Sequence, residues 1–377
     1  MHKVLLVFGT RPEATKMAPV YRALKSMPEV KPLVLLTGQH REQLQDALEL
    51  FNISAIGNLD LMEERQTMPG VASRMLPQLA SRFREVDPSF VLAHGDTLTT
   101  FVVAWVSFME GIPVGHVEAG LRSHDLEDPF PEEANRKLTD VLTSLELAPT
   151  VGARRNLLEE GKDPDNIVVT GQTAVDAVRI ASRSGELPDS FPQPPYITVT
   201  LHRRENWPRL EEIAEALAEV ARMHREYTFV YPVHLNPVVR EAVTPVLQSV
   251  SNFMLTDPLE YGTMASLLDQ SSMVITDSGG LQEEGASLGV PVLVCREVTE
   301  RPEGLETGIL RLAGTEKKQV MRNAKEALED PSFLNQDSAM NPYGDGRAGE
   351  RVAQAVAWKL GVTEKPEDWQ TQCLSDQ

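Results

Sequence analysis

The chain has 377 residues, of which 41% are hydrophobic and 24% charged, a composition typical of a globular protein and not of a disordered or fibrous one. This length predicts two domains of ordinary size. The formal net charge of −19 disfavours nucleic acid as a partner, because proteins that bind it usually present a basic face. An acidic protein with an anionic ligand must instead gather its cationic side chains at one site.

The apolar runs and the cysteine content indicate where in the cell the protein is located. The longest apolar runs, such as 4–8, have the length of a strand and are too short to cross a bilayer, so no membrane partner is expected. The first residues lead directly into such a strand without a cleavable small-residue site, which predicts no signal peptide. Two cysteines, Cys295 and Cys373, argue against a disulfide scaffold. We therefore expect a soluble, cytoplasmic protein.

Short β-rich runs alternate with amphipathic patterns through the first half of the chain. Buried strands are predicted at 3–8, 32–37, 90–93, 114–117 and 166–170. Helices are predicted at 17–27 and 43–51. The pattern breaks at 182–195, SRSGELPDSFPQPP, where Ser, Gly and four prolines predict a linker.

A second alternating series follows the linker. Its predicted strands are 196–201, 229–233, 253–255, 273–276 and 292–294, with a helix at 211–227. Alternating strands and helices imply parallel sheets with right-handed crossovers. The predicted fold class is α/β, with two Rossmann-like domains facing across a cleft, over 1–185 and 186–365, and a polar tail at 366–377. Ligands of such sheets lie beyond the carboxyl ends of the strands.

The first polar motif, Gly9–Lys16, follows the first strand. Gly9 permits a tight turn and Pro12 suits the first turn of a helix. Arg11 and Lys16 bring two cations to a helix N-terminus, where an anion can bind. Alone, the motif would be read as a turn, a cap and two solvated charges, and it lacks the GxGxxG dinucleotide pattern.

The motif Asp277-Ser278-Gly279-Gly280 follows the strand at 273–276 and precedes a helix. Glycines there let backbone N–H groups approach phosphate oxygens at the positive end of the helix. Glu284, just over one turn into that helix, is placed to accept hydrogen bonds from ribose hydroxyls. The order strand, glycines, helix favours a diphosphate site over a flexible turn.

Carboxylates follow other strands. Asp96 lies in HGDT, Glu118 in GHVEAGLR, and Glu132 and Glu133 in PFPEE. Carboxylates that converge on one site can be driven to unequal pKa values, as acid/base chemistry requires. Asp96 alone would be read as a turn residue and Glu132 as solvated. Glu118 follows an apolar strand, where an unpaired carboxylate is costly.

Two further motifs supply cationic or imidazole groups at strand ends. They are HRREN, with His202 and Arg203, and YPVH, with His234. HRREN is expected to open the first helix of the second domain. A lone His234 would be read as structural. No HExxH, His-rich or Cys-pair spacing is present, so no metal is expected.

Taken in order, these motifs strongly resemble those of the bacterial non-hydrolysing UDP-N-acetylglucosamine 2-epimerases, from about Lys3 to Arg347. The matching segments are GTRPEATKMAPV, TGQHREQL, HGDT, GHVEAGLRS, PFPEEANR, HRREN, YPVHLNP, TDSGGLQEE, PVLVCREVTERPE and NPYGDGRA. The resemblance implies a glycosyltransferase-B-like fold, a homodimer, a role in cell-surface polysaccharide synthesis and no external cofactor. The implied reaction interconverts UDP-GlcNAc and UDP-ManNAc. UDP is eliminated anti to the C2 proton, giving 2-acetamidoglucal, and then re-adds.

The resemblance also implies residue roles. The catalytic positions are Asp96, Glu118, Glu132 and His202. The positions that bind UDP are Arg11, Lys16, Ser278, Gly279, Gly280 and Glu284. A regulatory site for a second UDP-GlcNAc is implied at Gln39, His40, Arg65, Arg203 and His234. Glu42 and Trp207-Pro208 depart from the family pattern near that site and are expected to weaken or reshape activation.

Two other functions stay open at this point. A hydrolysing epimerase would release ManNAc and UDP, although the Gln39-His40 and Arg65 matches disfavour it. A glycosyltransferase-like protein that only binds UDP-sugars is compatible with the fold. The carboxylates of Asp96, Glu118 and Glu132 disfavour that function, because a protein that only binds UDP-sugars has no need of them.

Overall fold

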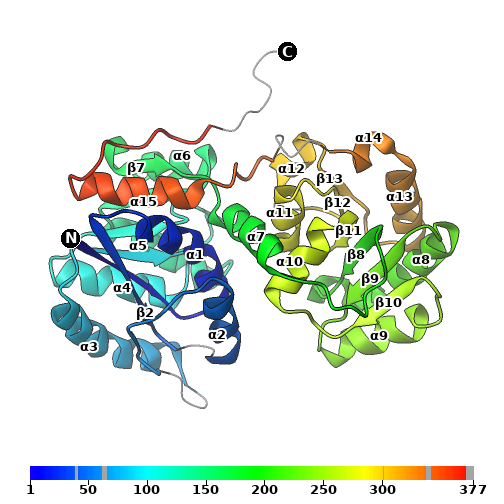
Figure 1. Ribbon diagram of the computed structural model, residues 1–377, viewed down its shortest axis with the longest axis horizontal. Helices are drawn as coiled ribbons and strands as arrows, with labels where there is room; N and C mark the ends of the chain where they lie inside the picture. The colour runs from blue at the N-terminus through cyan, green and yellow to red at the C-terminus, as the bar shows by residue number, and fades with distance from the viewer. Residues whose placement is uncertain (39–40, 62–65, 300, 337–340, 371–377) are drawn as a thin grey trace. The chain divides into compact units, whose positions relative to one another are not determined.

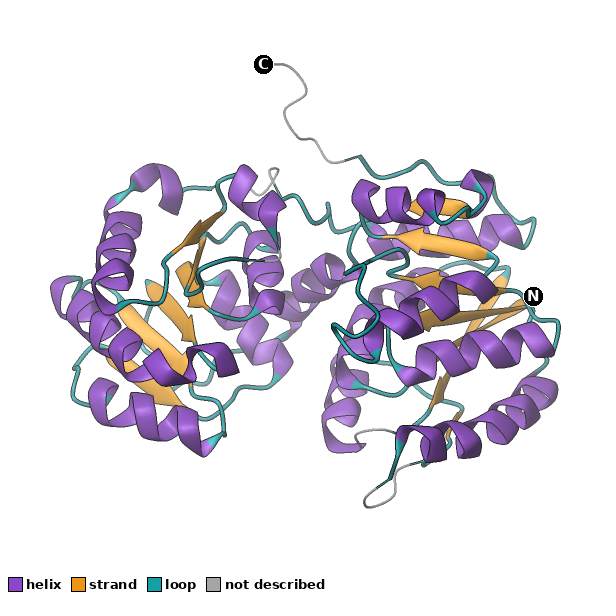
Figure 2. Cartoon of the chain, turned by 180° about the vertical axis from the view of Figure 1, so that it is seen from behind, coloured by secondary structure: helices purple, strands orange, loops and turns teal. Residues whose placement is uncertain are grey.

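The computed structural model describes residues 1–38, 41–61, 66–299, 301–336 and 341–370 (Figure 1). The chain divides into two compact units. The first comprises Met1–Ala177 and Tyr343–Gln370, and the second comprises Val178–Pro342. Helices flank the sheet of each unit, which confirms the predicted α/β class with two Rossmann-like parts (Figure 2).

The first unit contains a seven-stranded sheet in the order β3-β2-β1-β4-β5-β6-β7, and all its pairs are parallel. Its strands are β1 His2–Phe8, β2 Val30–Leu36, β3 Gly57–Asn58, β4 Phe90–His94, β5 Val114–Val117, β6 Leu145–Ala148 and β7 Ile167–Val169. Its helices are α1 Arg11–Lys25, α2 Arg41–Leu50, α3 Met68–Val86, α4 Leu98–Met109, α5 Glu132–Leu142, α6 Val151–Glu159, η1 Pro164–Asn166 and α15 Ala348–Lys359. Helix α7, Thr173–Ser184, runs from the first unit into the second.

The second unit contains a six-stranded parallel sheet in the order β10-β9-β8-β11-β12-β13. Its strands are β8 Tyr196–Thr200, β9 Thr228–Pro232, β10 Phe253–Thr256, β11 Ser271–Thr276, β12 Val292–Val294 and β13 Leu310–Leu312. Its helices are η2 Arg204–Arg209, α8 Leu210–Met223, α9 Pro237–Leu247, α10 Tyr261–Asp269, α11 Gly279–Ser287, α12 Pro302–Glu306, α13 Lys317–Glu329 and α14 Pro331–Leu334. HRREN therefore opens a short 3₁₀ helix, and the α-helix begins only at Leu210.

Both sheets are buried on two faces, as is usual for parallel strands. In the first unit, Leu5, Val7 and Val91 pack against α3 and α4. In the second, Ile197 and Tyr231 belong to a cluster that includes the apolar face of α8. Each sheet reverses its strand order beside its first strand, so the loops after β1 and β4, and those after β8 and β11, lie at adjacent carboxyl ends.

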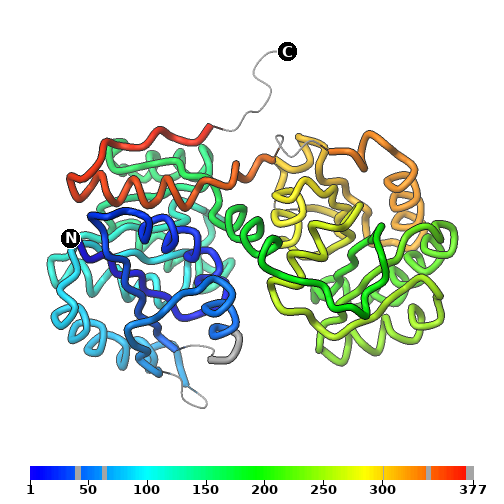
Figure 3. Tube along the Cα trace, in the orientation of Figure 1, coloured from blue at the N-terminus to red at the C-terminus, as the bar shows by residue number. Residues whose placement is uncertain are grey.

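The C-terminal segment departs from the predicted boundaries. The sequence predicted a second domain over 186–365, but α15 packs along α1 in the first unit (Figure 3). Gly349 permits the approach, since a Cβ there would lie 2.7 Å from the carbonyl carbon of Pro19. The predicted tail also begins inside this unit, because Trp369 N donates to Val169 O at 2.7 Å and Asp368 accepts from Val169 N at 2.7 Å.

Three strands were missed by the sequence prediction. β6 contains the charged but fully buried Glu146, which interrupts its apolar pattern. β13 contains Arg311, and β3 has two residues only. Among the described residues, no helix has the length and apolar character needed to cross a membrane.

Candidate active site

The loop after β1 is held by the buried carboxylate of Glu13. Its Oε2 accepts hydrogen bonds from Gly9 N at 3.0 Å, Thr10 N at 2.8 Å and Thr10 Oγ1 at 2.8 Å. Its Oε1 accepts from Thr97 Oγ1 at 2.8 Å, which ties this loop to the one after β4. The Thr10 side chain caps α1 in return, so Arg11 stands exposed at the first helical position. Glu13 therefore joins two of the loops that carry predicted site residues.

Glu118 follows β5 in a left-handed backbone conformation, with φ of +71°. Its Oε2 lies 2.6 Å from Lys16 Nζ and 3.6 Å from His94 Nε2. Burial alone would raise the pKa of Glu118, but the ion pair and hydrogen bond with Lys16, together with the nearby His94, hold it well below its usual range. Glu118 is therefore an ionised carboxylate, held in a backbone conformation that non-glycine residues rarely adopt.

Asp96, after β4, is paired with Arg136 of α5. The Nε and Nη2 atoms of Arg136 lie 3.1 Å and 2.5 Å from Asp96 Oδ2. Arg136 Nη1 also lies 3.1 Å from Glu133 Oε2. Glu133 is fully buried and accepts from the backbone N–H groups of Ser123 and His124. Glu133 thus shapes the loop after β5, while Arg136 orients Asp96.

Glu132 is the first residue of α5, one position from Glu133 but in a different environment. Its Oε2 atom is buried and makes no hydrogen bond to the described part of the chain. Neither ring nitrogen of His94, which is 3% exposed, has a hydrogen-bond partner within that part either. Buried polar atoms without partners are uncommon and call for an explanation, of which a bound ligand is one.

In the second unit, the fully buried Asp277 holds the loop after β8. Its carboxylate accepts from His202 N at 3.0 Å, Arg203 N at 3.0 Å and Asn206 Nδ2 at 3.0 Å. These bonds connect the end of β11 to the adjacent strand β8. Asp277 therefore sets the backbone from which His202 and Arg203 project.

Gly279 begins α11 between two guanidinium groups. A Cβ built at Gly279 would lie 3.3 Å from Arg203 Nη2 and 3.3 Å from Arg301 Cζ. Arg301 is oriented by Glu283, whose Oε1 lies 2.8 Å from both its Nε and its Nη2. Ser278, the N-cap of α11, makes no side-chain capping bond. Two arginines at a helix N-terminus are an arrangement that can bind an anion.

His202 stacks on His234, with ring centroids 5.5 Å apart and an interplanar angle of 19°. Burial lowers the pKa of His202, and the neighbouring His234 and Arg203 lower it further, whereas Asp277 opposes the shift. His202 is thus a neutral imidazole at neutral pH, able to donate one hydrogen bond without adding charge. Glu284, on α11, accepts from Tyr261 Oη at 3.3 Å.

The structure groups the predicted site residues by unit. Lys16, Asp96, Glu118 and Glu132 lie on loops or first turns at the carboxyl edge of the first sheet. His202, Arg203 and Gly279 lie at the carboxyl edge of the second sheet. Gln39, His40 and Arg65 lie outside the described residues, and the side chain of Glu42 is not described.

Four residues at these edges were given no role from the sequence: Glu13, Arg136, Asp277 and Arg301. Each acts by holding another group or by flanking Gly279, and pairing of that kind leaves no spacing signal. All four nevertheless lie inside motifs that the sequence analysis quoted, GTRPEATK, PFPEEANR, TDSGG and ERPE.

The chain is similar to known proteins over nearly its whole length. The family model for UDP-N-acetylglucosamine 2-epimerase matches residues 22–357. The UDP-N-acetylglucosamine 2-epimerase of Bacillus subtilis is 43% identical over 371 residues, covering 97% of this chain and 98% of that protein. The Escherichia coli K12 enzyme is 44% identical over 368 residues, covering 94% and 98%. A solved UDP-GlcNAc 2-epimerase from Neisseria meningitidis, bound to UDP-GlcNAc, is 38% identical with a TM-score of 0.80, covering 95% and 99%. By this match over nearly its whole length, the chain belongs to the UDP-N-acetylglucosamine 2-epimerase family.

Proposed function

We propose that the chain interconverts UDP-GlcNAc and UDP-ManNAc by anti elimination of UDP to 2-acetamidoglucal, followed by re-addition of UDP. The observation that carries the proposal is Glu118, an ionised carboxylate held 2.6 Å from Lys16 at the end of β5. Proton removal from C2 needs a held base, and departure of UDP needs a cationic site for the diphosphate. The first unit supplies the base and the second supplies two arginines around Gly279.

The catalytic residues proposed are Asp96, Glu118, Glu132 and His202. The three carboxyl groups differ in environment, which supports a division into acid and base. Glu118 is ion-paired with Lys16, Asp96 is paired with Arg136, and one buried oxygen of Glu132 has no partner among the described residues. The neutral imidazole of His202 is proposed to donate a hydrogen bond near the diphosphate.

The proposed UDP site comprises Arg11, Lys16, Ser278, Gly279, Gly280, Glu284 and Arg301. Arg203 and Arg301 flank Gly279, which favours the diphosphate there. Glu284 lies on the first two turns of α11 and is proposed to accept from the ribose hydroxyls, with Tyr261 orienting it.

Solvent isotope incorporation tests the reaction. UDP-ManNAc incubated with the enzyme in deuterated water should give UDP-GlcNAc that carries deuterium at C2, because the proton returned to C2 comes from a group in exchange with solvent. Epimerisation with full retention of protium would contradict elimination. Release of free ManNAc in step with turnover would instead indicate the hydrolysing reaction.

A variant separates catalysis from binding. Asp96→Asn should abolish turnover while leaving UDP affinity within a few-fold, because Asp96 belongs to the first unit and Gly279 with its arginines to the second. Asp257→Asn, an exposed carboxylate paired with Arg240, serves as the matched control and should keep full turnover. Full activity in Asp96→Asn would contradict the catalytic assignment and leave a UDP-sugar-binding role.

We propose an allosteric site for a second UDP-GlcNAc that includes Arg203 and His234, together with Gln39, His40 and Arg65. His234 is exposed and stacks on His202, a placement that supports coupling of such a ligand to the catalytic residues. Trp207 is one of the residues that depart from the family pattern. Its Nε1 donates to His202 O at 3.3 Å, so it contacts the loop that carries His202. Trace UDP-GlcNAc should accelerate conversion of UDP-ManNAc. A rate independent of UDP-GlcNAc would contradict the proposal.

We also propose a homodimer, formed through an apolar surface on α4 and α5. Trp105, Phe108 and Met109 on α4, and Leu138 and Val141 on α5, are exposed, although large apolar side chains are costly in water. Light scattering should give twice the chain mass for the wild type and a monomer for Phe108→Glu. Val298→Glu, at an exposed position in the second unit, should remain dimeric. A dimeric Phe108→Glu would contradict this surface.

A cytoplasmic location and a role in cell-surface polysaccharide synthesis complete the proposal. The low cysteine content and the free thiol of the buried Cys295 support a reducing compartment. Fractionation of cells should find the protein with cytoplasmic markers, and its appearance in another fraction would contradict this location.

A further inference from the structure

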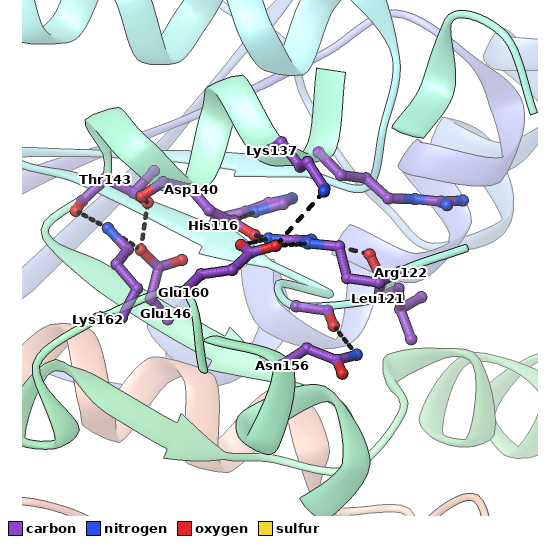
Figure 4. Close-up of polar contacts among 12 residues, drawn as sticks. His116, Leu121, Arg122, Lys137, Asp140, Thr143, Glu146, Asn156, Glu160 and Lys162 are labelled. Atoms are coloured by element: carbon purple, nitrogen blue, oxygen red, sulfur yellow. Dashed lines mark hydrogen bonds and ion pairs between the residues drawn. The ribbon is translucent and has the colours of Figure 1, made fainter. Parts of the chain in front are cut away.

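His116 lies fully buried on β5, two residues before Glu118, within a cluster of polar side chains (Figure 4). Its Nδ1 faces Asp140 Oδ1 of α5 in a short contact, and its Nε2 lies 2.6 Å from the carbonyl oxygen of Gly95. The proposed reaction does not use His116. The cost of burying such a group raises the question of what it does.

The two contacts decide the charge of the ring. A carbonyl oxygen only accepts, so Nε2 must carry a proton and donate it to Gly95 O. Asp140 accepts from Arg122 Nη2 at 2.6 Å through its other oxygen, which favours its ionised form. An ionised carboxylate only accepts, so Nδ1 must donate as well. The ring is therefore an imidazolium. The directions of the two pKa shifts agree with this charge. Burial would lower the pKa of His116, but Asp140 raises that pKa overall. Burial would raise the pKa of Asp140, but His116 and Arg122 lower that pKa overall.

A second layer of charges surrounds this pair. Arg122 lies between Asp140 and Glu160, with Nη2 2.6 Å from an oxygen of each. Lys162 Nζ lies 2.7 Å from Glu146 Oε1 of β6. Burial, with the nearby charge of Asp140, raises the pKa of Glu146 to about 7.

A metal ion is a poorer explanation of the cluster. One ligand atom from each of His116, Asp140 and Glu146 lies within 4.8 Å of the others. His116 Nδ1 and Asp140 already bind each other, however, and Arg122 and Lys162 supply positive charge beside the carboxylates. A metal would have to displace the proton on Nδ1 and would meet these cations.

Hydrogen bonds hold successive backbone groups of Gly95 and Asp96. Gly95 has a φ of +70° and its N–H donates to Val117 O at 3.0 Å. Its carbonyl accepts from His116, and the next carbonyl, of Asp96 itself, accepts from Asn135 Nδ2 at 2.9 Å. We propose that His116, as a protonated imidazolium clamped between Asp140 and Gly95, is the positioning residue that aims the Asp96 carboxylate at its substrate. This inference rests on the proposed catalytic role of Asp96.

His116→Gln tests the inference. A glutamine amide has donors on one atom only and no charge, so it cannot bridge Gly95 O and Asp140 as the imidazolium does. A displacement of a catalytic group by about 1 Å costs up to about 10²-fold in rate. We expect kcat to fall at least about tenfold, with the KM and the UDP Kd within about threefold, since His116 contacts none of the residues proposed to bind UDP among the described residues.

Glu146→Gln is the matched control, because it changes a carboxyl group of the same buried cluster that has no contact with Gly95 or Asp96 among the described residues. It should keep kcat within about threefold even if the melting temperature falls. If kcat of His116→Gln stays within about threefold of wild type, or falls no further than that of Glu146→Gln, the inference is overturned. Should His116→Gln fail to fold, Asp140→Asn replaces it under the same criteria.

Two more measurements complete the test. In protein labelled with ¹⁵N-histidine, one ring should keep both N–H protons at a pH where a free histidine has lost one, and Asp140→Asn should shift that signal. Absence of such a ring would overturn the inference. Asp96→Asn, assayed in parallel, separates the two claims. Full turnover in Asp96→Asn defeats the proposed function of Asp96, whereas loss of turnover there with normal kcat in His116→Gln defeats the inference alone.

Discussion

Lys16 Nζ lies 2.6 Å from Glu118 Oε2, and this ion pair joins the first helix to the end of β5 across 102 positions of sequence. The lysine is on the second turn of α1, and Glu118 stands where the backbone has a φ of +71°. The pair keeps Glu118 ionised although it is largely buried. Lys16 thereby sets the pH range over which Glu118 can accept a proton.

Lys16→Met should move the acid limb of the kcat profile to higher pH. Lys16 lowers the pKa of Glu118, so its removal lets that carboxylate protonate at a higher pH, where it no longer acts as a base. An opposite charge at this distance is worth about 1–3 pKa units, so a shift of at least about one unit is expected. Lys25→Met, at the exposed end of the same helix, should leave the limb in place. An unmoved limb in Lys16→Met would show that Glu118 is not the titrating base.

Gly279→Ala tests the start of α11, with Gly152→Ala on α6 as its control. A Cβ at Gly279 would press on Arg203 and Arg301 at 3.3 Å, whereas one at Gly152 would make an ordinary contact of 3.6 Å with Thr150 Oγ1. We expect the UDP Kd to rise about tenfold in Gly279→Ala, because both guanidinium groups must shift. Calorimetric titration with UDP measures this, and equal affinities in the two variants would argue against a diphosphate at Gly279.

Asp277→Asn should weaken UDP binding and destabilise the second unit. One carboxylate oxygen becomes an NH₂ group that faces the N–H donors of His202 and Arg203. A buried donor without a partner costs about 1–3 kcal/mol. Urea unfolding and UDP titration should both detect the change, while Asp269→Asn, exposed on α10, should match the wild type. Wild-type UDP affinity in a destabilised Asp277→Asn would mean that the carboxylate supports the fold alone.

Asp176 should make the stability of the first unit depend on pH. It accepts from Gly349 N at 2.8 Å and Ala348 N at 3.2 Å, which holds the start of α15 against α7. Burial raises the pKa of Asp176 to about 6, although these N–H groups oppose the shift. Its folded pKa exceeds that of an unfolded aspartate, so folding takes up a proton between about pH 4 and pH 6.

The free energy of unfolding should therefore decrease as the pH rises through this window, by roughly 1.4 kcal/mol per pH unit from this group. Asp176→Asn lacks the titrating group, so its stability relative to wild type should improve between pH 4.5 and pH 7 in urea unfolding. A constant difference between the two proteins at all pH values would show that Asp176 does not titrate here.

Strands and motifs were accessible from the sequence because their signals are local. Apolar runs predicted β5 and β12 to the residue, and polar residues directly after such runs marked Asp96, Glu118 and the start of α11. The strand β6 was hidden by Glu146, whose burial depends on Thr143 at the C-cap of α5 and on Lys162 in the loop before η1.

Within the proposed site, the pattern of residue types indicated which groups carry the chemistry, since a carboxylate at a strand end is visible without coordinates. It did not indicate which of two adjacent carboxylates is structural. Glu133 is enclosed by backbone N–H groups and Arg136, whereas Glu132 has a buried oxygen without a described partner.

The sequence by itself determined the fold class, the carboxyl-edge position of the polar motifs and the family. Only the tertiary structure decided that α15 packs on α1, that Lys16 sets the charge of Glu118, and that His116 is held as an imidazolium by Asp140. The physical reason is that periodicity and turn chemistry depend on neighbouring residues. Charge states and side-chain orientations depend instead on burial and on partners that are distant in the chain.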